Sequence, residues 1–71
     1  MKIKKIDIID GGTFKLNNKE GEFTITEIKE GIHQPKDCEV MLGYSIYSND
    51  IQIAWVPYHV ITTIFFEMKN D

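Results

Sequence analysis

Apolar and polar residues alternate along this chain in short runs. β-branched and aromatic residues fill the runs, and glycine, asparagine and aspartate separate them. Alternation with a period of two is typical of half-buried β-strands, and turn residues between such runs indicate antiparallel hairpins. The apolar spacing of a helix does not persist over three turns anywhere in the sequence. The pattern therefore predicts an all-β domain, an antiparallel meander with no long helix.

The first predicted hairpin has residues 10–12, "DGG", as its loop. A three-residue hairpin loop needs one residue in the left-handed conformation, and a glycine is available for that position. With this loop, Ile8 lies opposite Phe14, and Ile6 lies opposite Leu16 on the same face. One register therefore pairs all four of these apolar side chains.

Two irregular segments follow this hairpin. Residues 23–26 alternate cleanly, but the apolar phase then slips by one position at Glu27 and Ile28. A β-bulge produces such a slip, and small barrels use bulges to bend a strand from one sheet into the next. Residues 30–37 have the least β character in the chain and contain a glycine and a proline. We therefore predict a surface loop there.

The clearest predicted pairing is a hairpin with a two-residue turn at Ser48 and Asn49. On one face this turn pairs large apolar residues, namely Ile46 with Ile51, Tyr44 with Ile53, and Leu42 with Trp55. The other face pairs Ser45 with Gln52, Gly43 with Ala54, and Met41 with Val56. A slip of one residue would invert both faces, so the pattern specifies the register. The small residues Gly43 and Ala54 predict a strip where the sheet bends or another backbone approaches closely.

Near the C-terminus, the apolar run "IAWVPYHVITTIFF" is interrupted by proline, tyrosine and histidine. Pro57 fixes φ and lacks an N–H donor, so the preceding strand must end there. Residues 58–60 are then suited to one 3₁₀ turn before a last strand, residues 61–68. The alternative is that this corner is the wall of a site that uses Tyr58 and His59. We favour the corner, with His59 bonded to a backbone carbonyl rather than acting as a base.

The segment "WVPYHV" resembles the closing segment of Src-homology-3 domains, where an aromatic residue, a proline and hydrophobic residues precede the last strand. "PYHVITTI" is similar to the second Sm motif of bacterial Sm-like RNA chaperones, and "IDIIDGGTFKL" is similar to the first. Both resemblances imply a small five-stranded antiparallel barrel, partly open and SH3-like or Sm-like, over residues 1–71 as a single domain. They imply a shape only, because one fold hosts many functions.

The charge balance argues against a general nucleic-acid binder. Eight lysines and no arginine stand against eleven acidic residues, which gives a formal net charge of -3. Lysine and arginine neutralise phosphates in nucleic-acid complexes, and arginine reads guanine edges.

Cysteine content and the N-terminal pattern bear on the compartment. Cys38 is the only cysteine, so no intrachain disulfide can form, and we expect a reducing compartment, the cytoplasm. The first apolar residues alternate with lysine instead of forming a block. We therefore expect neither a signal peptide nor contact with a membrane.

Candidate catalytic chemistry is sparse. His33, Cys38 and His59 are the residues suited to nucleophilic, metal-binding or proton-transfer roles near neutral pH, and their spacing matches no zinc motif. The carboxylates include no pair that periodicity places around one cleft. Gly11 and Gly12 precede no helix, so they do not predict a phosphate-binding loop. We expect a protein that is not an enzyme and has no metal site or cofactor.

Aromatic residues remain as candidates for a binding surface. Phe65 and Phe66 are adjacent in a strand, so they must point to opposite faces. Thr63 and Glu67 share the face of Phe65, which predicts an exposed Phe65 and a buried Phe66. An exposed apolar patch often marks an interface. The candidate binding residues are Phe65, Tyr58, Tyr47, His59 and Gly43.

These features predict a non-catalytic protein-interaction module. It would bind another protein, or a second copy of itself, through an aromatic face or a β edge. A composition rich in lysine, asparagine and isoleucine also suits a small phage-encoded or mobile-element regulator that inhibits a host protein. The alternative is an Sm-like or OB-like nucleic-acid-binding protein. Its stacking residues would be Tyr44, Tyr47, Tyr58 and Phe66, with Lys2, Lys4 and Lys5 along the phosphate backbone.

Overall fold

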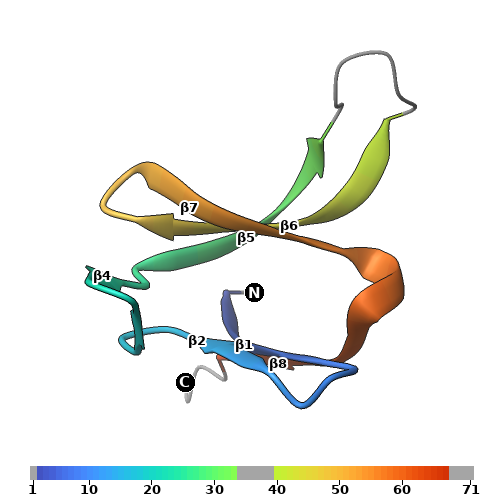
Figure 1. The fold of residues 1–71 in the computed structure, drawn as a ribbon, viewed down its shortest axis with the longest axis horizontal. Helices are drawn as coiled ribbons and strands as arrows, with labels where there is room; N and C mark the ends of the chain where they lie inside the picture. Colours follow the sequence, from blue (N-terminus) through green and yellow to red (C-terminus); the bar gives the residue numbers. More distant parts are fainter. Residues whose placement is uncertain (1, 34–39, 68–71) are drawn as a thin grey trace.

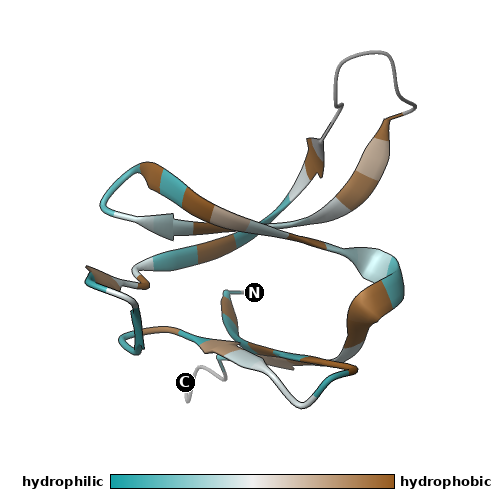
Figure 2. Ribbon diagram, viewed as in Figure 1, coloured by the Kyte–Doolittle hydropathy of each residue, from teal (hydrophilic) through white to brown (hydrophobic). Residues whose placement is uncertain are grey.

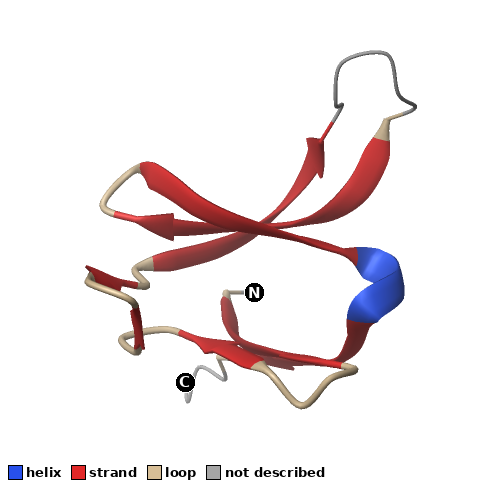
Figure 3. Cartoon of the chain, in the orientation of Figure 1, coloured by secondary structure: helices blue, strands red, loops and turns tan. Residues whose placement is uncertain are grey.

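Eight short antiparallel strands and one 3₁₀ turn make up the part of the chain that the computed structural model describes, residues 2–33 and 40–67 (Figure 1, Figure 3). In chain order they are β1 (Ile3–Ile8), β2 (Thr13–Lys15), β3 (Lys19–Glu20), β4 (Phe23–Thr24), β5 (Glu27–His33), β6 (Met41–Ser48), β7 (Ile51–Pro57), the 3₁₀ turn η1 (Tyr58–Val60) and β8 (Ile61–Phe66). The predictions of an all-β chain and of a 3₁₀ turn before the last strand are confirmed.

The strands form three small sheets rather than one five-stranded barrel. The orders β2-β1-β8 and β5-β6-β7 are three-stranded, and β3 pairs with β4. In Figure 1 the two three-stranded sheets lie one above the other, with η1 joining them at one end and β4 at the other. No ladder joins these two sheets within the described residues, so the described part of the chain closes no barrel.

The first hairpin has the predicted three-residue loop, but the loop lies one residue earlier. Ile6 pairs with Phe14, so the predicted pairing of Ile8 with Phe14 is wrong. Residues 9–11 form the loop, and Gly11 takes the left-handed conformation with φ of 91°. A three-residue hairpin loop needs this conformation at its last position. The sequence offers two adjacent glycines, and the first of them takes that position.

The second hairpin turns at Asn49 and Asp50, one residue later than predicted. Both residues have positive φ, 48° and 72°, as a type I′ turn requires at its two central positions. Ser48 therefore pairs with Ile51. Asparagine and aspartate tolerate the left-handed region better than serine does, which explains why the turn includes Asp50 and not Ser48.

A β-bulge then changes the pairing of the rest of β7. Ser45 pairs with Trp55, and Ile53 is the extra residue opposite β6. One extra residue moves every later side chain to the other face of the sheet. Trp55 consequently lies on the face away from Ile46, and the predicted pairing of Leu42 with Trp55 is wrong.

The position of this turn can be tested by a single substitution. Asp50→Gly is expected to raise the free energy of unfolding by about 0.5–1 kcal/mol, because glycine adopts positive φ without a steric penalty. If Asp50 stood in a strand, as a turn at Ser48 and Asn49 would place it, glycine would destabilise the hairpin instead. Urea unfolding followed by the fluorescence of Trp55 measures the sign, and Gln52→Gly is the destabilising control within the strand.

β5 runs through Gly31 to His33, so the surface loop predicted over residues 30–37 is wrong for its first part. Gly31 pairs with Gly43 in the middle of the ladder. Glycine keeps both backbone hydrogen-bonding groups, so it can continue a ladder beside a long partner strand. The rest of the predicted loop, and Cys38, lie outside the described residues.

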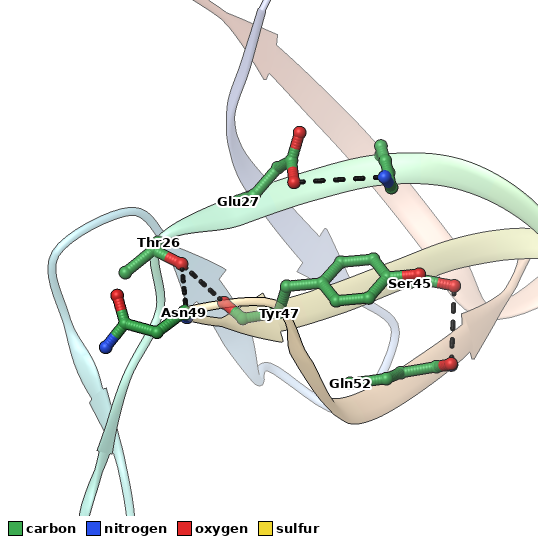
Figure 4. A network of polar contacts seen from close by, with 7 residues as sticks. Thr26, Glu27, Ser45, Tyr47, Asn49 and Gln52 are labelled. Atoms are coloured by element: carbon green, nitrogen blue, oxygen red, sulfur yellow. Dashed lines mark hydrogen bonds and ion pairs between the residues drawn. The ribbon is translucent and has the colours of Figure 1, made fainter.

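The β-bulge predicted at Glu27 and Ile28 is wrong: both residues pair regularly with β6, and the chain instead bends at Ile25 and Thr26, between β4 and β5. The carbonyl of Ile25 accepts a hydrogen bond from Asn17, whereas the N–H of Thr26 donates to Tyr47 of β6, each at 2.8 Å. The Thr26 hydroxyl also accepts the N–H of Asn49 at 2.8 Å (Figure 4). The chain thus changes its pairing partner within two residues, and one threonine ties the start of β5 to the second hairpin turn.

The buried core is aliphatic. Its members come from both three-stranded sheets and from the bend, and they are Ile3, Ile6, Ile25, Ile28, Ile46 and Val56. Phe14 and Tyr44 are partly buried and pack against the margin of this cluster. Because the core of the described residues is filled by aliphatic side chains, tyrosines and phenylalanines lie at its rim, where they form surface.

Candidate functional site

The face of β5 and β6 that is buried in the core continues beyond it. Along this face Glu30 pairs with Tyr44, and Ile32 then pairs with Leu42. The ladder between β6 and β7 ends at Pro57, so this end of the face has two strands only. Ile32 and Leu42 are 67% and 54% exposed, and Figure 2 shows apolar residues at these ends of β5 and β6. The inner face therefore extends into an exposed apolar surface.

The corner at η1 brings a second tyrosine to this face. The ring centroids of Tyr44 and Tyr58 lie 5.4 Å apart, with 41° between the ring planes. This spacing is typical of interacting aromatic pairs. The hydroxyl of Tyr58 donates a hydrogen bond to the carboxylate of Glu30. Glu30, Tyr44 and Tyr58, from β5, β6 and η1, thus form what we name the tyrosine cluster.

The tyrosine cluster stands between two concavities. The first, of about 480 Å³, is lined by Tyr44, Tyr58 and residues 61–64 of β8. The second, of about 340 Å³, has as its lining Lys2, Ile3, Glu27, Ile28, Lys29, Glu30, Tyr44 and Phe66. Tyr44 lines both concavities, and we name the two together the inter-sheet groove.

One wall of the inter-sheet groove is an edge strand. β8 pairs with β1 and is the last strand of its sheet in the described part of the chain. An edge strand presents backbone N–H and C=O groups on its open side, and these can pair with an added strand. The groove therefore combines backbone groups on one side with aromatic and aliphatic side chains on the other.

The ionisation of Tyr44 reflects this position. Burial raises the pKa of Tyr44 above its ordinary value of about 10, and the negative charge of Glu30 raises this pKa further. The neutral phenol is therefore the form of Tyr44 that the folded state favours.

Deprotonation of Tyr44 is expected to destabilise the fold. Since the folded-state pKa is raised, the unfolded chain loses the proton first, so this contribution to stability is intact below pH of about 10 and is lost as the pH rises through the folded-state value. Tyr44→Phe removes the titrating group. Its free energy of unfolding should therefore fall less than that of the wild type between pH of about 9 and pH of about 11. Equal losses in both proteins, measured by urea unfolding, would contradict the expectation.

The residues predicted as binding candidates lie on different surfaces. Tyr58 belongs to the tyrosine cluster, and His59 follows it on η1 with an exposed side chain. Phe65 lies on the outward face of β8 and is 38% exposed, as predicted. The ammonium group of Lys5 lies 4.4 Å from the centroid of its ring. Of these residues, only Tyr58 contributes a side chain to the groove lining.

Tyr47 and Gly43 lie on the face of β6 that points away from the groove. The ammonium group of Lys29 lies 4.9 Å from the Tyr47 ring centroid and 3.9 Å from the carboxylate of Glu27 (Figure 4). Gly43 pairs with Pro57 rather than with the predicted Ala54. Tyr47 and Gly43 therefore lie apart from the tyrosine cluster, and neither lines the groove.

Phe66 lies on the inward side of β8 beside Ile3, but it is 43% exposed, so its predicted burial is wrong. It stands at the end of β8, past the part of the strand where Ile61 and Ile64 pack against the core. The side chain lines the inter-sheet groove instead. The strand faces were therefore predicted correctly, whereas the extent of the core was not.

Three residues of this surface are missing from the sequence-based candidates: Glu30, Ile32 and Leu42. Tyr44 is among the candidates only as a stacking residue of the nucleic-acid-binding alternative. Leu42 is missed because the predicted register pairs it with Trp55. Glu30 and Ile32 are missed because they fall within the predicted loop. A signal for the continuing strand exists, because Ile28 and Ile32 are spaced in the period of a strand. Gly31 lies between these two isoleucines, and in the sequence it favours the loop prediction over a continuing strand.

A metal-binding cluster or a membrane-spanning helix in the described residues would bear on function. No three histidine, cysteine, aspartate or glutamate side chains of the described residues come together as a metal site. None of the helices in the described part of the chain is long and apolar enough to cross a membrane. What the groove offers is ring faces, aliphatic side chains, carboxylates and the backbone of an edge strand.

Comparison of the chain with protein-family models, with curated proteins and with solved structures gives no match. The likenesses of its segments to Src-homology-3 and Sm motifs therefore stay predictions. The chain is a small all-β protein with an open groove.

Proposed function

We propose that this chain is a non-catalytic protein-interaction module, built as a half-open β-barrel, that holds an extended segment of a partner protein in the inter-sheet groove. One observation carries the proposal. The edge strand β8 forms one wall of the groove, and the side chains of Tyr44 and Tyr58 line the same concavity. An extended segment can use both. Its backbone pairs with an open edge, and alternate side chains enter the neighbouring pockets.

An exposed apolar surface beside the groove suits an aliphatic or aromatic side chain of the segment. Ile32 and Leu42 are more than half exposed and adjoin the tyrosine cluster along one face. Covering such surface contributes about 25 cal/mol per Å² of apolar area removed from water. Tyrosine is enriched at interfaces because its ring buries a large area while the hydroxyl keeps a polar partner. A module of this kind would regulate or inhibit its partner by holding that segment in the groove, where other molecules cannot bind it.

A protein segment suits the groove better than a nucleic acid does. Two carboxylates, Glu27 and Glu30, stand in the lining beside Lys2 and Lys29. The groove therefore offers phosphates no excess of positive charge, and the whole chain has a formal net charge of -3. Phosphate neutralisation dominates nucleic-acid affinity, so binding there would be weak.

Selection from a random-peptide display library against the purified chain tests the proposal. Synthetic versions of the selected peptides should shift the NMR signals of Tyr44, Tyr58 and residues 61–64. Leu42→Ser should weaken their binding about tenfold, through lost apolar contact. Ile51→Ser is the matched control, because Ile51 is 59% exposed at the far turn of the β6–β7 hairpin.

Three results would overturn the proposal. Selected peptides could bind equally well to Leu42→Ser and to the wild type, which would place their site elsewhere. An oligonucleotide could shift the groove signals more strongly than any peptide does, which would favour a nucleic-acid binder. Light scattering could show a dimer whose groove signals are protected, which would make a second copy of the chain the occupant.

A further inference from the structure

The carboxylate of Glu30 is fixed in an exposed aromatic setting. The Tyr58 hydroxyl donates a hydrogen bond to it, and its own strand places it directly opposite Tyr44. An ionised carboxylate has about four acceptor positions, so the bond from Tyr58 leaves capacity for a second donor. The side chain of Glu30 is exposed, and that capacity faces solvent in the groove.

The chain places its own lysines over aromatic rings elsewhere. Lys5 lies over Phe65 at 4.4 Å, and Lys29 lies over Tyr47 at 4.9 Å. Lys29 is also 3.9 Å from the carboxylate of Glu27. Both contacts fill ring faces outside the tyrosine cluster. Neither of these two lysines stacks on Tyr44 or Tyr58, so a cation that contacts these rings and Glu30 could come from a partner.

We infer that the tyrosine cluster is a recognition site for a basic side chain, an arginine or lysine of the bound segment. Its positive group would lie against the rings of Tyr44 and Tyr58 and donate hydrogen bonds to Glu30. This inference rests on the proposed function, because the basic residue belongs to the segment held in the groove.

Two physical effects favour a cation at this position. A cation over a tyrosine face is attracted by the ring quadrupole, and a hydrogen bond between two charged groups is stronger than a neutral one. Arginine should bind more tightly than lysine, because its planar guanidinium stacks on a ring and donates to a carboxylate at the same time. The hydroxyl of Tyr58 acts as a positioning group, since it holds the carboxylate of Glu30.

The test uses small probes that do not depend on the rest of a peptide. N-acetyl-arginine methylamide and N-acetyl-lysine methylamide are titrated into the labelled full chain, with N-acetyl-citrulline methylamide as the neutral match of arginine. The arginine probe should shift the signals of Tyr44 and Tyr58, with lysine weaker and citrulline at least about tenfold weaker. Raising the salt concentration should weaken the two charged probes only.

A pair of variants isolates the carboxylate. Glu30→Gln should reduce affinity for the arginine probe about tenfold. Glu20→Gln changes the net charge equally at an exposed residue of β3 that lines neither concavity, so it should leave the affinity unchanged. The two-dimensional NMR spectrum of each variant shows that it is folded. Library-selected peptides should contain a basic residue whose replacement by citrulline or norleucine weakens binding to the wild type and not to Glu30→Gln.

The failure of this inference differs from the failure of the proposed function. Equal binding of the arginine and citrulline probes, or equal losses in Glu30→Gln and Glu20→Gln, would overturn the inference while peptides still bind in the groove. Peptides that bind outside the groove would overturn the proposed function, and with it the basic residue of the segment. Probe shifts at Phe65 or Tyr47 in place of Tyr44 and Tyr58 would also overturn the inference.

Discussion

Gly43→Ala is expected to destabilise the fold by about 3 kcal/mol or more, because the added methyl group has no room. A Cβ atom at this position would overlap the carbonyl oxygen of Val56 and lie 2.8 and 2.9 Å from two carbons of the Trp55 ring. The carbonyl belongs to a residue that pairs with Tyr44 in the same sheet, so it cannot move away alone. A domain of this size rarely has more than about 3–5 kcal/mol of stability, so most molecules should be unfolded.

Gly31→Ala is the matched control, because Gly31 stands directly opposite Gly43 in the ladder. A Cβ atom there would meet the hydroxyl oxygen of Ser45 at 3.1 Å, and a serine side chain can rotate. The expected loss is therefore much smaller. Thermal melts followed by circular dichroism compare the two variants. If both melt at the same temperature, the close approach of β7 to Gly43 is not what makes this glycine necessary.

The features that the sequence predicts correctly depend on local chemistry. Pro57 ends β7 because a proline has no N–H to donate, and the 3₁₀ turn follows at the predicted residues. Positive φ falls within the predicted turn regions, at Gly11 and at Asn49. These signals act over a few residues, so the order of the elements can be predicted without knowledge of the tertiary structure.

Register depends on longer-range packing and is therefore predicted less well. The bulge at Ile53 reverses the faces of β7, and the alternation of "IQIAWV" is equally compatible with both arrangements. What decides between them is packing, because Val56 is buried in the core and Trp55 covers Gly43. A pattern along one strand contains no information about which neighbour has room for a tryptophan.

The candidate site is the least predictable part. The hydrogen bond from Tyr58 to Glu30 joins residues 28 positions apart, and Tyr44 completes the cluster from a third element. No spacing along the chain marks these three residues as neighbours. They meet because β5 and β6 are longer than the ladder with β7, and because η1 turns the chain back across their inner face. Such a site follows from strand lengths and register, both of which the sequence predicts only approximately.

The groove depends on the packed core, and Ile6→Ala is expected to unfold most molecules, so that the core and the groove are lost together. Ile6 has 0% exposure in the middle of β1, paired with Phe14 of β2 on one side and with Ile64 of β8 on the other. Shortening a buried isoleucine to alanine costs about 2–5 kcal/mol, from lost burial and from the cavity left behind. That loss approaches the whole stability expected of a 71-residue chain, so the variant should be largely unfolded at room temperature.

Ile9→Ala is the control for Ile6→Ala, because it makes the same substitution three residues later at a side chain that is 67% exposed. Its unfolding midpoint in urea should stay close to that of the wild type, since little apolar area is lost from the folded state. Ile6 and Ile64 hold β8 against the core, and β8 forms the edge of the groove. Equal midpoints for the two variants would therefore mean that the Ile6 side chain does not pack in the core between the sheets. In that case β8 would not be held as the groove wall on which the proposed binding depends.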